Sequence, residues 1–72
     1  MWTSWEEGSY DHADRAPAES ALEAAMAFGR GRGPGSRVVC VIEGDGEGDP
    51  TPRQRFTVTV DAGGGCSAEL IG

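Results

Sequence analysis

The 72-residue chain contains no lysine, no asparagine, one histidine and two cysteines, and these shortages exclude several classes of function. A structural zinc site takes four cysteine or histidine ligands, more than Cys40, Cys66 and His12 supply. Two cysteines are also too few for a disulfide scaffold. We expect two free thiols in a reducing compartment, with one bridge between them as the alternative. No serine or cysteine lies in a context that selects it as a nucleophile. We therefore predict that the protein is not an enzyme and uses no cofactor or metal.

Long apolar stretches are also missing. The longest run spans residues 38–42, whereas a helix needs about 20 apolar residues to cross a bilayer. The first residues lack the basic and apolar segments of a secretory leader. With the expected free thiols and a residue usage typical of GC-rich coding, these features indicate a cytoplasmic protein of a bacterial cell.

Aromatic residues are few, which allows one small domain with a modest core. Twelve acids outweigh six arginines, so the net charge is −6. The acids gather in residues 1–28 and 43–49, whereas Arg30, Arg32 and Arg37 follow one another closely. A surface with this balance repels nucleic acid and favours basic partners.

Residues 16–28 show the strongest periodicity in the chain. Asp14 is a candidate N-cap, Pro17 lies in the first turn, where proline is tolerated, and Gly29 suits the position after a helix. One face at helical spacing is apolar and rich in small residues: Ala18, Ala21, Leu22 and Ala25, flanked by Met26 and Phe28. The pattern predicts an amphipathic helix that lies close against a sheet.

The rest of the chain is predicted to form strands and connections. Residues 1–14 hold a short strand followed by a loop, residues 29–36 form a flexible Gly/Arg linker, and residues 37–71 contain antiparallel strands. The single domain, residues 1–72, is then α+β. One amphipathic helix packs on a small sheet of three to four antiparallel strands, in the order (β)-α-β-β-(β).

Alternation within the strands assigns their faces. If Arg37 and Glu43 face solvent, Val39 and Val41 do so too, which leaves two apolar side chains for a partner or a second copy. Residues 54–61 alternate cleanly between apolar and polar side chains. The predicted core is Leu22, Ala25, Met26, Phe28, Val38, Cys40, Ile42, Phe56, Val58, Val60 and Leu70.

An acidic, glycine-rich loop separates two of these strands. Glu43, Asp45, Glu47 and Gly48 take the first, third, fifth and sixth positions of a calcium-binding loop. The twelfth position is Gln54, which lacks the bidentate carboxylate that such a site needs. A solvated hairpin loop is the favoured interpretation, and a weak calcium site is the alternative.

The arginines and glycines of residues 29–36 resemble a short RNA-contacting segment. No aromatic residue lies between the arginines to stack on bases, and the net charge opposes a phosphate backbone. We interpret the segment as a linker whose arginines stay solvated or pair with nearby acids. Direct nucleic-acid binding is not expected, and an RNA-binding accessory role is kept only as an alternative.

Three aromatic residues, Trp2, Trp5 and Tyr10, lie within the first ten positions. Tryptophan and tyrosine are common anchors at protein interfaces, and they also cap the cores of small domains. Both interpretations stay open. An unpaired edge strand offers a further surface for a partner or a second copy.

Three stretches together resemble a known class of small proteins: residues 17–28 (PAESALEAAMAF), 36–46 (SRVVCVIEGDG) and 55–61 (RFTVTVD). Their arrangement is similar to that of compact, acidic helix-plus-sheet proteins encoded by phages and prophages, including some anti-CRISPR proteins. The resemblance rests on organisation, size and charge. It implies a non-enzymatic inhibitor that occludes a basic or nucleic-acid-binding surface of a partner protein.

We therefore predict a non-enzymatic protein-binding module, most simply an inhibitor of the phage type, whose partner presents a basic surface. A small self-assembling or homodimeric protein is the alternative. The predicted partner-binding residues are two tryptophans and seven acids: Trp2, Trp5, Glu6, Glu7, Glu19, Glu23, Asp45, Glu47 and Asp49.

Overall fold

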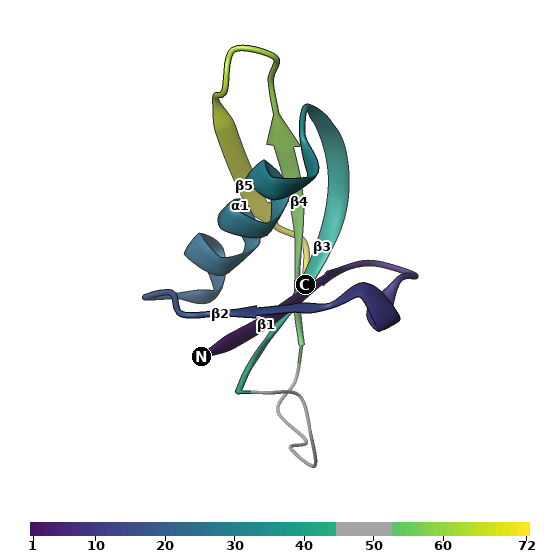
Figure 1. The fold of residues 1–72 in the computed structure, drawn as a ribbon, viewed down its shortest axis with the longest axis vertical. Coiled ribbons are helices and arrows are strands. Elements are labelled where there is room, and N and C mark those ends of the chain that lie inside the picture. The colour runs from purple at the N-terminus through teal and green to yellow at the C-terminus, as the bar shows by residue number, and fades with distance from the viewer. Residues whose placement is uncertain (45–52) are drawn as a thin grey trace.

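The computed structural model describes residues 1–44 and 53–72. One helix packs on one face of an antiparallel sheet whose strands lie in the order β2-β1-β3-β4-β5, as Figure 1 shows. The elements are β1 (Trp2–Glu6), the 3-10 turn η1 (Tyr10–His12), β2 (Asp14–Ala16), α1 (Ala21–Arg32), β3 (Gly35–Glu43), β4 (Gln54–Val60) and β5 (Cys66–Leu70). The α+β class and the single helix on an antiparallel sheet are confirmed.

The described sheet has five strands, whereas the sequence predicted three to four. The additional strand is β2, which lies where the sequence predicted the end of a loop and the start of the helix. Its three residues are exposed and carry no apolar alternation, so no local signal marks them. They form a strand because β1 pairs with them, with Trp2 opposite Ala16 and Ser4 opposite Asp14.

The helix begins later than predicted, at Ala21. Ser20, and not Asp14, is the N-cap, since its hydroxyl accepts a hydrogen bond from the Glu23 amide at 3.2 Å. The Glu23 carboxylate in turn accepts from the Glu19 amide at 3.1 Å, which is close to a capping box. Pro17 therefore precedes the helix. Residues 16–19 form a connection in place of a first turn.

The helix also ends later than predicted, so the first part of the expected linker is helical. Gly29 and Gly31 lie inside α1, and the cap is Gly33, whose φ of 90° suits glycine. Gly29 faces β4 so closely that a Cβ in its place would overlap Val58 Cγ1. Glycine at this position lets helix and sheet approach, which outweighs its weak helix propensity.

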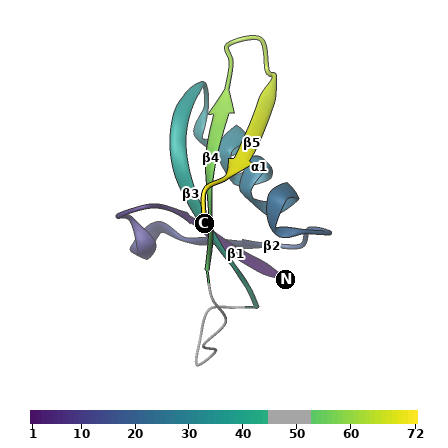
Figure 2. The same cartoon turned by 180° about the vertical axis from the view of Figure 1, so that it is seen from behind.

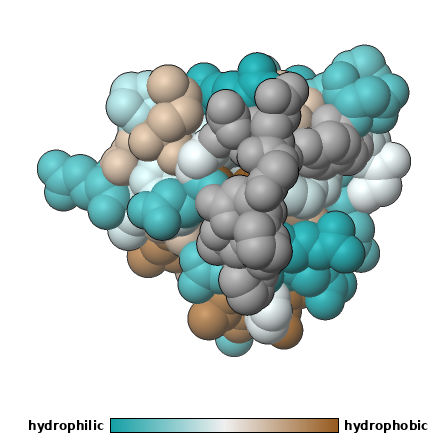
Figure 3. Space-filling model, turned by 90° about the horizontal axis from the view of Figure 1, so that it is seen from below, coloured by the Kyte–Doolittle hydropathy of each residue, from teal (hydrophilic) through white to brown (hydrophobic). Residues whose placement is uncertain are grey.

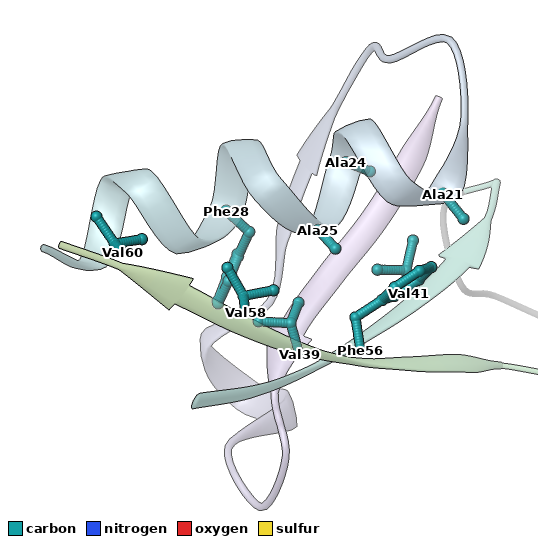
Figure 4. Close-up of a cluster of buried hydrophobic side chains, with 9 residues drawn as sticks. All are labelled: Ala21, Ala24, Ala25, Phe28, Val39, Val41, Phe56, Val58 and Val60. Carbon is teal, nitrogen blue, oxygen red and sulfur yellow. The ribbon is translucent and has the colours of Figure 1, made fainter. Parts of the chain in front are cut away.

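The core forms between α1 and the sheet, as Figure 4 shows, and it uses the opposite face of β3 from the one predicted. Val39 and Val41 are fully buried beneath the helix, beside Phe56 and Val58 of β4. The assumption that Arg37 faces solvent caused the error. Its side chain is only 14% exposed, because it lies on the helix side of the sheet under the end of α1.

Other predicted core positions also differ. Ala25, Phe28, Phe56, Val58 and Val60 are buried as expected. Leu22 and Leu70 are 42% and 54% exposed, because Leu22 lies on the flank of α1 and Leu70 at the end of an edge strand. Three more residues are only half-buried: Met26, Val38 and Ile42.

The sheet face turned away from the helix is visible in Figure 2. Register places Trp5, Cys40 and Arg55 side by side on this face. Trp5 and Cys40 are 5% and 1% exposed, so Cys40 is buried as predicted but outside the main core. Both Cys40 and Cys66 are free thiols. No helix among the described residues is long and apolar enough to span a membrane.

Candidate functional site

A groove of about 280 Å³ runs between α1 and the β1–β2 edge of the sheet. It exists because α1 packs over β1, β3, β4 and β5 while β2 extends beyond the helix (Figure 1). The strand side and the helix side each contribute three apolar residues to its walls: Trp2, Ala16 and Pro17, and Ala24, Ala27 and Phe28. Small alanine side chains on the helix leave the space open.

Trp2 forms one wall of the groove and is held in place. Its indole Nε1 donates a hydrogen bond to the carbonyl oxygen of Ala18 at 3.0 Å. The bond ties β1 to the connection between β2 and α1, across sixteen residues of sequence. Because its polar atom is already bonded, the half-buried ring presents only an apolar surface to the groove.

Ser4 contributes a hydroxyl to the groove, whose lining also includes the charged residues Asp14 and Arg15. Ser4 lies on the helix side of β1, opposite Val41 and Asp14, and is 4% exposed. Within residues 1–44 and 53–72 its hydroxyl has no hydrogen-bond partner. Because no fully buried side-chain oxygen or nitrogen of the described residues lacks a partner, this hydroxyl oxygen reaches solvent in the groove. The groove thus contains one hydroxyl that is available to a ligand.

A second hollow adjoins this groove and is acidic. The two share Pro17 and Ala27, and the second is lined by Glu19 and Glu23, with Arg30 at its other end. The cap at Ser20 places both residues at the start of the helix, where the Glu23 carboxylate accepts from the Glu19 amide. An apolar groove and an acidic hollow therefore lie side by side on one surface.

Arg32, in the last turn of the helix, contacts two residues that line the groove, Phe28 and Asp14. Its guanidinium donates to the His12 carbonyl oxygen at 3.2 Å and approaches an Asp14 carboxylate oxygen at 3.5 Å. The same group stacks on the ring of Phe28, 4.4 Å from its centroid. These contacts join α1 to η1 and β2. The Arg32 guanidinium therefore makes its contacts within the fold.

Arg37 also makes its contacts within the fold. It donates to the carbonyl oxygens of Gly29 and Gly33, at 3.2 and 3.0 Å, and lies 3.9 Å from a Glu6 carboxylate oxygen. A cation at this position satisfies carbonyl groups at the helix C-terminus and complements the helix dipole. The predicted arginine–glycine linker is thus partly helix, partly strand, and its arginines support the fold.

The opposite face of the sheet carries a separate ion pair. Arg55 Nε donates to a Glu7 carboxylate oxygen at 2.7 Å. Burial, together with the charge of Glu7, raises the pKa of the neighbouring Cys40 thiol. The hydrogen bond and charge of Glu7 raise the pKa of Arg55. Cys40 is therefore an unreactive structural thiol.

The structure divides the predicted partner-binding residues among several places. Trp2, Glu19 and Glu23 come together around the groove and the acidic hollow. Trp5 and Glu7 lie on the opposite face of the sheet, and Glu6 pairs with Arg37 near the C-terminal end of α1. Three predicted residues lie outside the described part of the chain: Asp45, Glu47 and Asp49. The calcium-loop hypothesis concerns the same segment.

Sequence reasoning missed Ser4, Ala24 and Ala27 as site residues. The sequence does contain a signal for the two alanines, because Ala24 and Ala27 form a second line of small residues on the helix, beside the one that packs in the core. Nothing local marked Ser4, because its position in the groove depends on the pairing of β1 with β2 and β3. No family model, curated protein or solved structure matches this chain. The function is therefore argued from geometry.

Proposed function

We propose that this chain is a non-enzymatic, cytoplasmic protein-binding domain that attaches to a basic surface of a partner protein through the helix side of its β2 edge. The observation that carries the proposal is the apolar groove of Trp2 and Phe28 directly beside the acidic hollow of Glu19 and Glu23. Apolar anchoring beside complementary charge is the usual arrangement of a specific protein interface.

The charge distribution supports a basic partner. Within the described part of the chain, Arg32 pairs with Asp14, Arg37 with Glu6 and Arg55 with Glu7. Glu19 and Glu23 remain exposed beside the groove. Exposed acids of this kind accelerate association with a cationic surface and make it sensitive to salt. An inhibitor that covers a nucleic-acid-binding surface is the form of this function that the sequence resemblance favours.

The experiment is photocrosslinking from the groove. p-Benzoylphenylalanine replaces exposed Ala27 in one variant and exposed Ser67, on the opposite face, in a control variant. In a bacterial host, we expect a basic protein to be captured from position 27 and not from position 67. Adding Glu19→Lys and Glu23→Lys should reduce that capture severalfold. The same products from both positions, or none from position 27, would exclude the groove as the binding surface.

A self-associating protein is the second candidate, and the β5 edge favours it. Leu70 and Ile71 are 54% and 45% exposed at the end of this edge strand. In the view from below, apolar residues form separate patches among hydrophilic ones (Figure 3). Light scattering across a concentration series tests this candidate, with Leu70→Glu as the variant. A mass of one chain at every concentration would exclude self-association.

A further inference from the structure

The size of the groove limits what can occupy it. A cavity of about 150 Å³ holds a benzene ring, and the groove offers about 280 Å³. It therefore accommodates one aromatic ring with a substituent. Of its two aromatic walls, the half-buried Trp2 offers an indole surface against which a second ring can stack or meet edge to face, whereas the buried Phe28 ring already contacts the Arg32 guanidinium.

The Ser4 hydroxyl limits the chemistry of that ring. A phenylalanine or leucine side chain would cover this hydroxyl without offering it a hydrogen bond, which disfavours binding. A lysine or arginine would meet Asp14 in the lining, but that carboxylate already lies 3.5 Å from the Arg32 guanidinium, and Arg15 in the same lining would repel a second cation. A phenol ring is apolar and uncharged, and its O–H group both donates to and accepts from another hydroxyl. A phenol can therefore fill the groove and hydrogen-bond to Ser4.

We propose that the groove binds the phenol ring of a tyrosine on the partner protein, hydrogen-bonded to Ser4. Glu19 and Glu23 would lie beside a basic residue adjacent to that tyrosine. The partner's basic character rests on the proposed function above, whereas the phenol site rests on the groove itself. The recognised feature is thus a tyrosine flanked by arginine or lysine on a protein surface.

The first test uses p-cresol and toluene, the side chains of tyrosine and phenylalanine, titrated into ¹⁵N-labelled protein and followed by NMR. We expect saturable shifts at Ser4, Ala16, Ala24 and Ala27. p-Cresol should bind about fivefold or more tightly than toluene, since only p-cresol satisfies the hydroxyl. Equal affinities, no saturable shift with p-cresol, or shifts confined to the opposite sheet face would overturn the phenol site.

Two variants sharpen this test. Ser4→Ala removes a hydroxyl that has no partner among the described residues, so the variant should fold and bind both compounds with equal affinity. Ser67→Ala removes an exposed hydroxyl on the opposite face and should keep the preference for p-cresol. If Ser4→Ala retained the full preference, another group would be responsible and the assignment of Ser4 would be wrong.

The second test separates the phenol site from the proposed function. N-acetyl-Arg-Tyr-Arg-amide should bind at least about fivefold more tightly than N-acetyl-Glu-Tyr-Glu-amide at low salt, and Glu19→Gln with Glu23→Gln should remove the difference. Selective p-cresol binding with equal affinity for both peptides would keep the phenol site and overturn the basic partner. Binding of the basic peptide without p-cresol selectivity would overturn the tyrosine anchor alone.

Discussion

The Arg37 guanidinium donates a hydrogen bond to the Gly33 carbonyl oxygen at 3.0 Å, and this contact joins the C-terminal end of α1 to β3. The same nitrogen donates to Gly29 at 3.2 Å. An arginine that sequence patterning places in solvent is therefore part of the packed structure. Its burial also explains why β3 presents Val39 and Val41 to the helix.

Replacing Arg37 by alanine should lower the free energy of unfolding by about 1–3 kcal/mol, because two helix carbonyl oxygens lose a charged donor. Arg30→Ala is the matched control. Arg30 is exposed on the same helix, and its replacement should change stability by less than about 0.5 kcal/mol. Urea denaturation of both variants measures the difference. Equal stability of the two would show that the Arg37 contacts contribute nothing.

Gly29 and Gly31 form a second matched pair within α1. Gly29→Ala should destabilise the protein by about 1–3 kcal/mol, since the added methyl group overlaps Val58. Gly31→Ala meets no atom within 4 Å and should stabilise the helix by up to about 1 kcal/mol. Thermal unfolding should move in opposite directions for the two variants. A gain in stability for Gly29→Ala would contradict the close approach of α1 and β4.

The face of β3 that packs against the helix is tested by two neighbouring valines. Val39→Ala should cost about 2 kcal/mol or more, because Val39 is fully buried under α1. Val38→Ala should cost clearly less, since Val38 is half-buried on the other face. Chemical denaturation of the two variants measures their free energies of unfolding and shows which face of β3 is buried. The reverse order would restore the assignment that alternation alone predicted.

Cys40 should be inert in the folded protein, while Cys66 should react first with a thiol reagent such as Ellman's reagent. Burial raises the Cys40 pKa above its ordinary value of 9.0, so folding favours the neutral thiol. The stabilising contribution is therefore complete below pH 9.0 and is lost as the pH rises through the raised pKa. Cys40→Ala should lack this alkaline loss. Rapid labelling of Cys40 at neutral pH would contradict its burial.

Much of the fold can be predicted from local patterns. The alternation of Phe56, Val58 and Val60 identifies the buried face of β4, and the apolar helix face places Ala25 and Phe28 in the core. The predicted helix start is wrong, because Asp14 and Pro17 are plausible start signals locally, whereas in the structure residues 14–16 pair with β1 and Ser20 is the N-cap. Of the candidate site, Trp2, Glu19 and Glu23 were predicted. Ser4 and the helix alanines were not, because the groove depends on how β1 pairs with β2.

The sequence by itself determined the α+β class, a single helix on an antiparallel sheet, and an acidic chain, since these depend on composition and on short periodicities. The tertiary structure decided which face of β3 is buried. Alternation has the same period for both faces, and the pairing of Val39 with Phe56 and the contact of Arg37 with the helix end distinguish them. The tertiary structure also created the groove. Its walls come from β1, β2 and α1, which come together only when β2 pairs with the outer side of β1.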